Sequence, residues 1–79
     1  MALDERSASI LALLQQTEDY VPVGELMEKF RISKRTVYYD MEKINGWLKL
    51  QRLPSIEYVR GTGYLLPRES RAGLPDSLG

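Results

Sequence analysis

The amino-acid sequence predicts a mainly α-helical domain that ends in a small β-hairpin. Apolar residues recur at helical spacing in three segments before Pro54, whereas β-prone residues alternate in the segment after it. Two of these β-prone runs are separated by the glycine-containing turn 61–63. The chain has 79 residues, of which 43% are hydrophobic, so it has material for one small core. We therefore expect a single domain of three helices and a hairpin.

The first helix is expected from residue 4 to about residue 16, where apolar residues recur and acidic residues occupy the first turn. The following run, residues 20–23, is β-prone but contains Pro22, which predicts a turn or a brief edge strand. A helix of about two turns is expected over residues 24–30, which carry three large apolar side chains. The chain thus begins with two helices joined by a short extended segment.

The third helix is expected over residues 34–50, with Ser33 as its N-cap. Its core side holds Val37, Met41, Ile44 and Leu48. The opposite side holds Arg35, Tyr39, Glu42 and Gly46, and the flanks hold Thr36 and Lys43 on one side and Tyr38 and Lys49 on the other. Gly46 costs about 1 kcal/mol relative to alanine, so a kink or an early end is possible there. Trp47 lies at the edge of the core side and is expected in a core or dimer contact.

The hairpin is expected over residues 56–66, with Gly61, Thr62 and Gly63 at its tip. This glycine turn lacks the lysine and the following helix of a phosphate-binding P-loop. After Pro67 the composition is mostly polar. We therefore expect a folded domain over residues 1–67 and a disordered linker over residues 68–79.

The net charge of zero conceals an uneven distribution along the chain. Residues 1–28 carry a net charge of −5, and residues 29–60 carry +5. A basic segment of this kind can form the electrostatic footprint of a nucleic-acid-binding surface. We expect the acidic segment, which includes Glu18 and Asp19, to face away from nucleic acid and to limit non-specific binding.

A short helix, a tight turn and a longer helix match the helix-turn-helix arrangement, and the hairpin after them would be a wing. In this winged helix-turn-helix arrangement the helix at residues 34–50 would enter the major groove of double-stranded DNA, and the wing would contact the backbone or the minor groove. We expect contacts to base edges from Arg35, Thr36 and Tyr39, and also from Tyr38. Phosphate contacts are expected from Ser33, Lys34, Lys43 and Arg60, with Thr62 at the wing tip.

Structural roles are open for several of these residues. Ser33 can serve as a helix cap alone. Asp40 flanks the core side and is expected to make hydrogen bonds within the domain. Tyr38 and Tyr39 can each pack partly against the wing, although the angle of Tyr39 favours exposure.

Two stretches of the chain resemble known regulators. Residues 32–41, Ile-Ser-Lys-Arg-Thr-Val-Tyr-Tyr-Asp-Met, resemble the recognition helix of bacterial winged helix-turn-helix regulators of the biotin-repressor and DeoR-like type. Residues 42–45 and 59–66 extend this likeness to the N-terminal domain of mannitol-operon-activator-like regulators, which carry phosphotransferase-system regulation domains. The resemblance covers about residues 6–67. DeoR-like proteins often have two arginines where this chain has Tyr38 and Tyr39, so their base preference does not carry over.

The resemblance implies a cytoplasmic transcription regulator that controls genes of carbohydrate uptake or metabolism. It also implies a homodimer formed through further domains, on which phosphotransferase-system proteins would act. The expected partner of these residues is a double-stranded DNA operator.

The composition argues against several other classes of function. Histidine and cysteine are absent, so imidazole bases, thiol nucleophiles and the common zinc sites are excluded, and we expect neither an enzyme nor a bound metal or cofactor. No apolar run has the length of a membrane span. Two alternatives remain, a winged-helix module that binds proteins without binding DNA, and an RNA-binding domain, although the RNA binders among the related antiterminators are β-rich.

Overall fold

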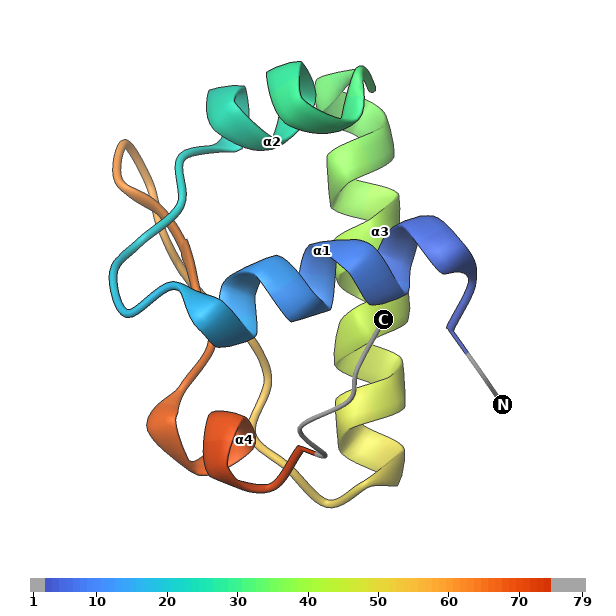
Figure 1. The fold of residues 1–79 in the computed structure, drawn as a ribbon, viewed down its shortest axis with the longest axis vertical. Coiled ribbons are helices and arrows are strands. Elements are labelled where there is room, and N and C mark those ends of the chain that lie inside the picture. The colour runs from blue at the N-terminus through green and yellow to red at the C-terminus, as the bar shows by residue number, and fades with distance from the viewer. Residues whose placement is uncertain (1–2, 75–79) are drawn as a thin grey trace.

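Three helices, a two-stranded hairpin and a short fourth helix follow one another along the chain. The computed structural model describes residues 3–74. Its elements are α1 (Glu5–Gln16), α2 (Val23–Phe30), α3 (Lys34–Leu50), β1 (Glu57–Val59), β2 (Gly63–Leu65) and α4 (Arg68–Ala72). Figure 1 shows α1 crossing α3 near its middle, with α2 beside the N-terminal end of α3 and α4 near its other end. The mainly helical fold with a wing is confirmed.

Side-chain caps define where two of the helices begin. The Asp4 carboxylate accepts a hydrogen bond of 2.7 Å from the backbone N–H of Ser7, so Asp4 caps α1 and the helix starts at Glu5. In the same way, the Ser33 hydroxyl accepts a hydrogen bond of 3.2 Å from the backbone N–H of Thr36. The predicted capping role of Ser33 is therefore confirmed.

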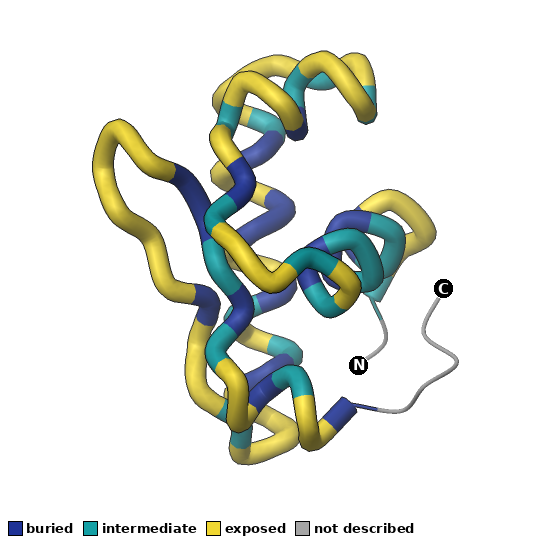
Figure 2. The backbone as a smooth tube through the Cα atoms, turned by 60° about the vertical axis from the view of Figure 1, so that its left-hand side comes forward, coloured by how far each residue is buried: buried dark blue, intermediate teal, exposed yellow. Residues whose placement is uncertain are grey.

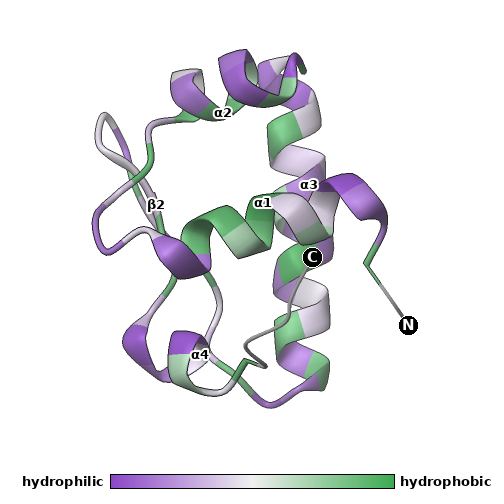
Figure 3. Cartoon of the chain, in the orientation of Figure 1, coloured by the Kyte–Doolittle hydropathy of each residue, from purple (hydrophilic) through white to green (hydrophobic). Residues whose placement is uncertain are grey.

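The hydrophobic core lies where α1 crosses α3. Its fully buried hydrophobic side chains come from three helices, from the residue before Pro22 and from the residue after β2, and they include Ile10, Leu11, Leu14, Val21, Leu26, Val37, Ile44, Leu48 and Leu66. Figure 2 shows that the buried segments face inward while the hairpin tip is exposed. Figure 3 shows α1 hydrophobic over its central turns and hydrophilic at both ends. Among residues 3–74, no helix is long and apolar enough to cross a membrane.

The third helix continues through Gly46 to Leu50, without the early end considered from the sequence. It stops where Arg52 adopts the left-handed conformation at φ 61°, and the Leu53 N–H then donates to the Leu48 carbonyl at 2.9 Å. Trp47 is partly buried and packs against the core, as predicted.

The hairpin is an antiparallel pair in which Glu57 lies opposite Leu65 and Tyr58 lies opposite Tyr64. The far side of β2 pairs with the segment before α2, because Val21 and Tyr64 exchange backbone hydrogen bonds of 2.7 and 2.9 Å. Of the turn and the brief edge strand considered for residues 20–23, the bridge at Val21 corresponds to the brief edge strand. We call residues 57–65 the wing. The bridge attaches the wing, through Tyr64, to the segment just before α2.

The prediction of a disordered linker from residue 68 onward is wrong for residues 68–74. Arg68–Ala72 form α4, and Ser70 and Leu74 are buried. The Ser70 hydroxyl donates to the Pro54 carbonyl at 2.5 Å, and Arg71 Nη2 donates to the carbonyls of Thr17 and Leu66 at 2.7 and 3.3 Å. The hydrogen bonds to Pro54 and Thr17 connect α4 to segments far away in the sequence, so its order does not follow from its own polar composition. Residues 75–79 lie outside the described part of the chain.

Candidate nucleic-acid interface

The exposed face of α3 begins with two neighbouring cation–tyrosine pairs, and in each pair the cation precedes the tyrosine by one helical turn. The ammonium of Lys34 lies 5.9 Å from the ring centroid of Tyr38. The guanidinium carbon of Arg35 lies 5.7 Å from the ring centroid of Tyr39, and Arg35 Nε donates to the Tyr39 hydroxyl at 3.3 Å. Tyr38 and Tyr39 are 41% and 51% exposed, so both rings are accessible beside their cations. The exposure predicted for Tyr39 is confirmed.

A tight turn places the start of α3 next to α2. Arg31 ends α2 in the left-handed conformation at φ 53°, and the Ile32 N–H donates to the Met27 carbonyl at 3.0 Å. One residue later Ser33 caps α3, with its hydroxyl 3.0 Å from the hydroxyl of Thr36. Ser33 is exposed and Thr36 is partly buried. The predicted helix, turn and helix therefore form one unit, and the N-terminal end of α3 faces outward.

A cluster of tyrosines joins α3 to the wing. The rings of Tyr58 and Tyr64 face each other across the hairpin, with centroids 4.8 Å apart. Burial raises the pKa of Tyr64 to about 12, and the nearby Tyr38 and Tyr58 contribute to this shift. Tyr64 is therefore protonated at neutral pH. The Asn45 side chain, whose carbonyl accepts a hydrogen bond of 2.8 Å from the Ile56 N–H, holds the entry to β1 against α3.

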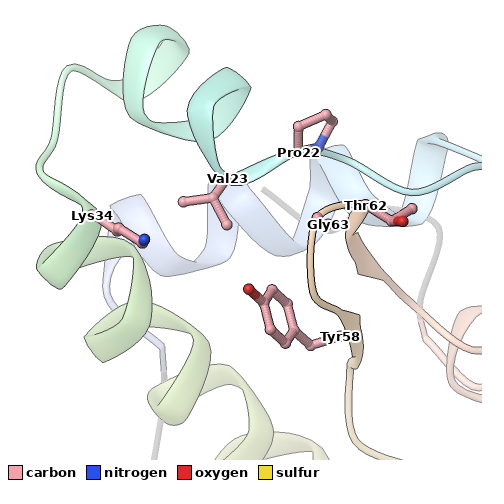
Figure 4. Close-up of a pocket in the computed structure, with 7 residues that line it drawn as sticks. Pro22, Val23, Lys34, Tyr58, Thr62 and Gly63 are labelled. Atoms are coloured by element: carbon pink, nitrogen blue, oxygen red, sulfur yellow. The ribbon is translucent and has the colours of Figure 1, made fainter.

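An open hollow of about 230 Å³ lies between the wing and the start of α3. Lys34, Tyr58 and Thr62 line it, together with Pro22, Val23, Gly61 and Gly63. Figure 4 shows the Lys34 amine extending from α3 toward the wing and the Tyr58 hydroxyl pointing into the same space. The structure thus brings Lys34 and Thr62 to one hollow, although they lie far apart in sequence. Arg60 is exposed in the turn beside it.

Lys43 lies on a different side of α3 from this hollow. Its ammonium is 2.8 Å from the Asp4 carboxylate and 3.7 Å from the Asp40 carboxylate. Asp40 has no exposed surface and accepts two hydrogen bonds from Arg6, from Nε at 2.6 Å and from Nη2 at 3.0 Å. The structural role predicted for Asp40 is therefore confirmed. These four residues, which we call the α1–α3 ion network, tie the start of α1 to the middle of α3.

The α1–α3 ion network predicts a loss of stability in acid. The hydrogen bonds from Lys43 and from Ser7 hold the pKa of Asp4 well below its usual value of 3.8. Because the pKa is lower in the folded state, the ionised Asp4 stabilises the fold above about pH 4, and this contribution disappears as the pH falls further. Asp4→Asn keeps a helix-capping oxygen but removes the charge. We expect it to lower the unfolding midpoint at pH 7.

The measurement is thermal unfolding of the wild type and of Asp4→Asn between pH 7 and pH 2. The gap between their midpoints should narrow progressively below about pH 4, because Asp4 of the unfolded wild type then binds a proton that the folded protein binds only at lower pH. A gap that stays constant across this range would show that the charge of Asp4 does not contribute.

The structure gathers most of the residues predicted from the sequence. Six lie on the outer face of α3 or on the wing, namely Lys34, Arg35, Tyr38, Tyr39, Arg60 and Thr62. Ser33 and Thr36 sit at the N-terminal end of α3, hydrogen-bonded to each other, and Lys43 lies in the α1–α3 ion network. Sequence reasoning missed Tyr58 and Asn45, which respectively line and support the wing side of this face.

The comparisons with known proteins agree with this arrangement. A family model described as HTH domain matches residues 6–65, which extend from the first turn of α1 to the end of β2. No curated protein and no solved structure matches the chain.

Proposed function

Because the chain belongs to the helix-turn-helix (HTH) domain family, a family of DNA-binding transcription regulators, we propose that it binds double-stranded DNA in a sequence-specific manner. In this proposal α3 enters the major groove and the wing lies along the backbone or the minor groove. The fold and its family favour a regulator over an enzyme. The supporting observation is that exposed cations and hydrogen-bonding side chains share the face formed by the start of α3 and the wing tip.

The proposed contacts divide into two groups by their place on this face. Arg35 and Tyr39 project from the middle of the exposed face, where base edges would lie, and Thr36 and Tyr38 flank them. Ser33, Lys34, Arg60 and Thr62 are proposed to contact phosphate, since they surround the free N–H groups at the N-terminal end of α3 or lie at the wing tip. We leave Lys43 out of this set because its ammonium is held by Asp4.

The finer biological role rests on the resemblance described for residues 6–67. We propose that the regulator acts in the cytoplasm on genes of carbohydrate uptake or metabolism, and that it binds its operator as a homodimer through other domains. Phosphotransferase-system proteins would act on those domains. A monomeric module with few phosphate contacts should bind weakly, so the second copy would raise the affinity.

The main alternative is a protein-docking module that does not bind DNA. It is favoured by Tyr58 and Val59, which are 47% and 40% exposed on the wing. However, Lys34 and Thr62 line the hollow beside Tyr58, and Arg60 follows Val59. A face with cations between its aromatic side chains fits a phosphate backbone better than it fits an apolar partner.

Salt dependence of binding tests the proposal. The logarithm of the association constant should fall linearly with the logarithm of the salt concentration, and each neutralised phosphate contact adds about 0.9 to the slope. We expect Lys34→Gln to reduce the magnitude of the slope by about 1 on any duplex, because its amine would no longer displace a counterion.

Lys43→Gln is the matched control, since it removes the same charge from the same helix outside the proposed contacts. Its slope should equal that of the wild type, provided circular dichroism shows that the variant is folded. A slope reduced by Lys43→Gln but not by Lys34→Gln would contradict the proposed orientation of α3. Absence of duplex binding at low salt would refute the function itself.

A further inference from the structure

The two cation–tyrosine pairs at the start of α3 differ in the direction in which the cationic side chain projects. Lys34 extends toward the wing and lines the hollow beside Tyr58. Arg35 is exposed, is absent from the lining of that hollow, and lies against Tyr39, the most exposed tyrosine of the helix. Arg35 therefore projects toward whatever faces the outer surface of α3.

The contact with Tyr39 occupies one particular nitrogen of Arg35. Nε donates to the Tyr39 hydroxyl at 3.3 Å, and the guanidinium carbon lies 5.7 Å from the ring centroid. None of the ion pairs in residues 3–74 involves Arg35. The contact thus restrains the side chain through Nε and leaves the two terminal nitrogens, Nη1 and Nη2, available for a partner.

Two parallel N–H donors select among the base edges of the major groove. Guanine presents two acceptors there, O6 and N7, and these match the spacing of the terminal guanidinium donors. Adenine presents one acceptor and one amino donor, so a guanidinium cannot make both hydrogen bonds to it. A restrained arginine loses less conformational freedom on binding than a free one, which strengthens this selection.

We propose that Arg35 selects a guanine in the DNA site through Nη1 and Nη2, and that Tyr39 is the positioning residue that holds its guanidinium. This inference rests on the proposed function, because it requires α3 to enter the major groove. It assigns Tyr39 a role through Arg35 rather than a base contact of its own. It also names a feature of the target: each half-site contains a guanine opposite the start of α3.

The test begins with selection of binding sites from random duplex DNA by the full 79-residue chain. The selected sites should contain one fixed guanine for the wild type, and Arg35→Ala should lose that preference. Replacing this guanine by 7-deazaguanine, which lacks the N7 acceptor, should weaken wild-type binding about tenfold. Inosine keeps both O6 and N7, so replacing the guanine by inosine should leave the affinity unchanged. The affinity of the Arg35→Ala variant should be the same for the unmodified site and for both modified sites.

Tyr39→Phe tests the positioning role, because it keeps the ring and removes only the hydroxyl that accepts from Arg35. The ratio of affinities for the guanine site and for the same site with adenine should fall about three- to tenfold. Binding to random duplex DNA should stay the same. Tyr20→Phe is the matched control, because it removes the same hydroxyl from a tyrosine that precedes α2 and lies outside the proposed contacts, and its ratio should equal that of the wild type.

The outcomes separate this inference from the function on which it rests. If the wild type binds selected sites that contain no fixed guanine, or if 7-deazaguanine has no effect, Arg35 does not select guanine and the inference fails while DNA binding stands. If Tyr20→Phe and Tyr39→Phe change the ratio equally, the positioning role of Tyr39 fails. If the chain binds neither selected nor random duplex DNA, the proposed function itself fails.

Discussion

Gly63→Ala should lower the free energy of unfolding by about 3 kcal/mol, because the added methyl group has no space. Gly63 is buried and has φ 130°, a backbone conformation that side chains of L-amino acids rarely adopt. A Cβ atom at this position would overlap the Val21 carbonyl and would lie only 2.8 Å from the Pro22 nitrogen. The obstacle is backbone, so it cannot rotate away, and the bridge between Val21 and Tyr64 would have to open.

The matched control is Gly61→Ala, at the other end of the same turn. Gly61 also has a positive φ, 82°, but a Cβ atom added there would meet no other atom within 4 Å. It should therefore cost only about 1 kcal/mol, the conformational penalty alone. Urea denaturation measures both values. Equal losses for the two variants would show that close contact with the Val21 backbone does not hold the wing.

Arg6→Met should lower the free energy of unfolding by about 2 kcal/mol, because it leaves the Asp40 carboxylate buried without its main partner. Breaking a fully buried ion pair costs about 3–5 kcal/mol, but the Arg6 side chain is 43% exposed and Lys43 remains 3.7 Å from Asp40. The expected loss is smaller for these two reasons.

The double variant Arg6→Met with Asp40→Leu distinguishes two causes of the lost stability. One is the buried Asp40 carboxylate left without its partner, and the other is the lost packing of the Arg6 side chain. Asp40 lies among the buried residues of α3, so an apolar side chain there is compatible with its surroundings. Because the double variant has no unpaired buried charge, it should recover part of the stability lost by Arg6→Met alone. Chemical denaturation of the wild type and of the variants provides the comparison. Strictly additive losses would mean that Arg6 and Asp40 do not act as a pair.

The periodic elements of the fold could be predicted from the sequence, because their signals are local. Helical spacing identified α3, and the Ser33 cap fixed its start. The turn at residues 61–63 likewise identified the hairpin. The order of α4 could not be predicted, since Ser70 and Arg71 are polar residues whose partners, Pro54 and Thr17, lie 16 and 54 positions away.

The candidate site was predictable to the same extent. The face of α3 that bears Arg35 and Tyr39 follows from the helical period and from the position of the core residues. The surroundings of Lys43 do not, because Asp4 lies 39 positions away and reaches Lys43 only once α1 packs across α3. The helical period indicates the direction in which a side chain projects. It does not indicate which residues of another helix contact that side chain.

The charge pattern acquires a structural meaning from these contacts. Two ion pairs join the negative first part of the chain to the positive middle part. Asp4 pairs with Lys43, and Arg6 pairs with Asp40. Some of the positive charge is therefore neutralised within the fold. Lys34, Arg35 and Arg60 are in no ion pair of the described residues and remain available for DNA.

The most direct test of the proposed interface is a titration of the ¹⁵N-labelled chain with a selected duplex, followed by NMR. We predict that the largest shifts of the amide signals occur at residues 33–39 and 60–62, at the start of α3 and at the wing tip. The amides of Glu18 and Asp19, together with those of the α1–α3 ion network around Asp4 and Lys43, should move little. If the largest shifts instead occur on α1 while residues 33–39 stay unchanged, α3 is not the helix that enters the major groove.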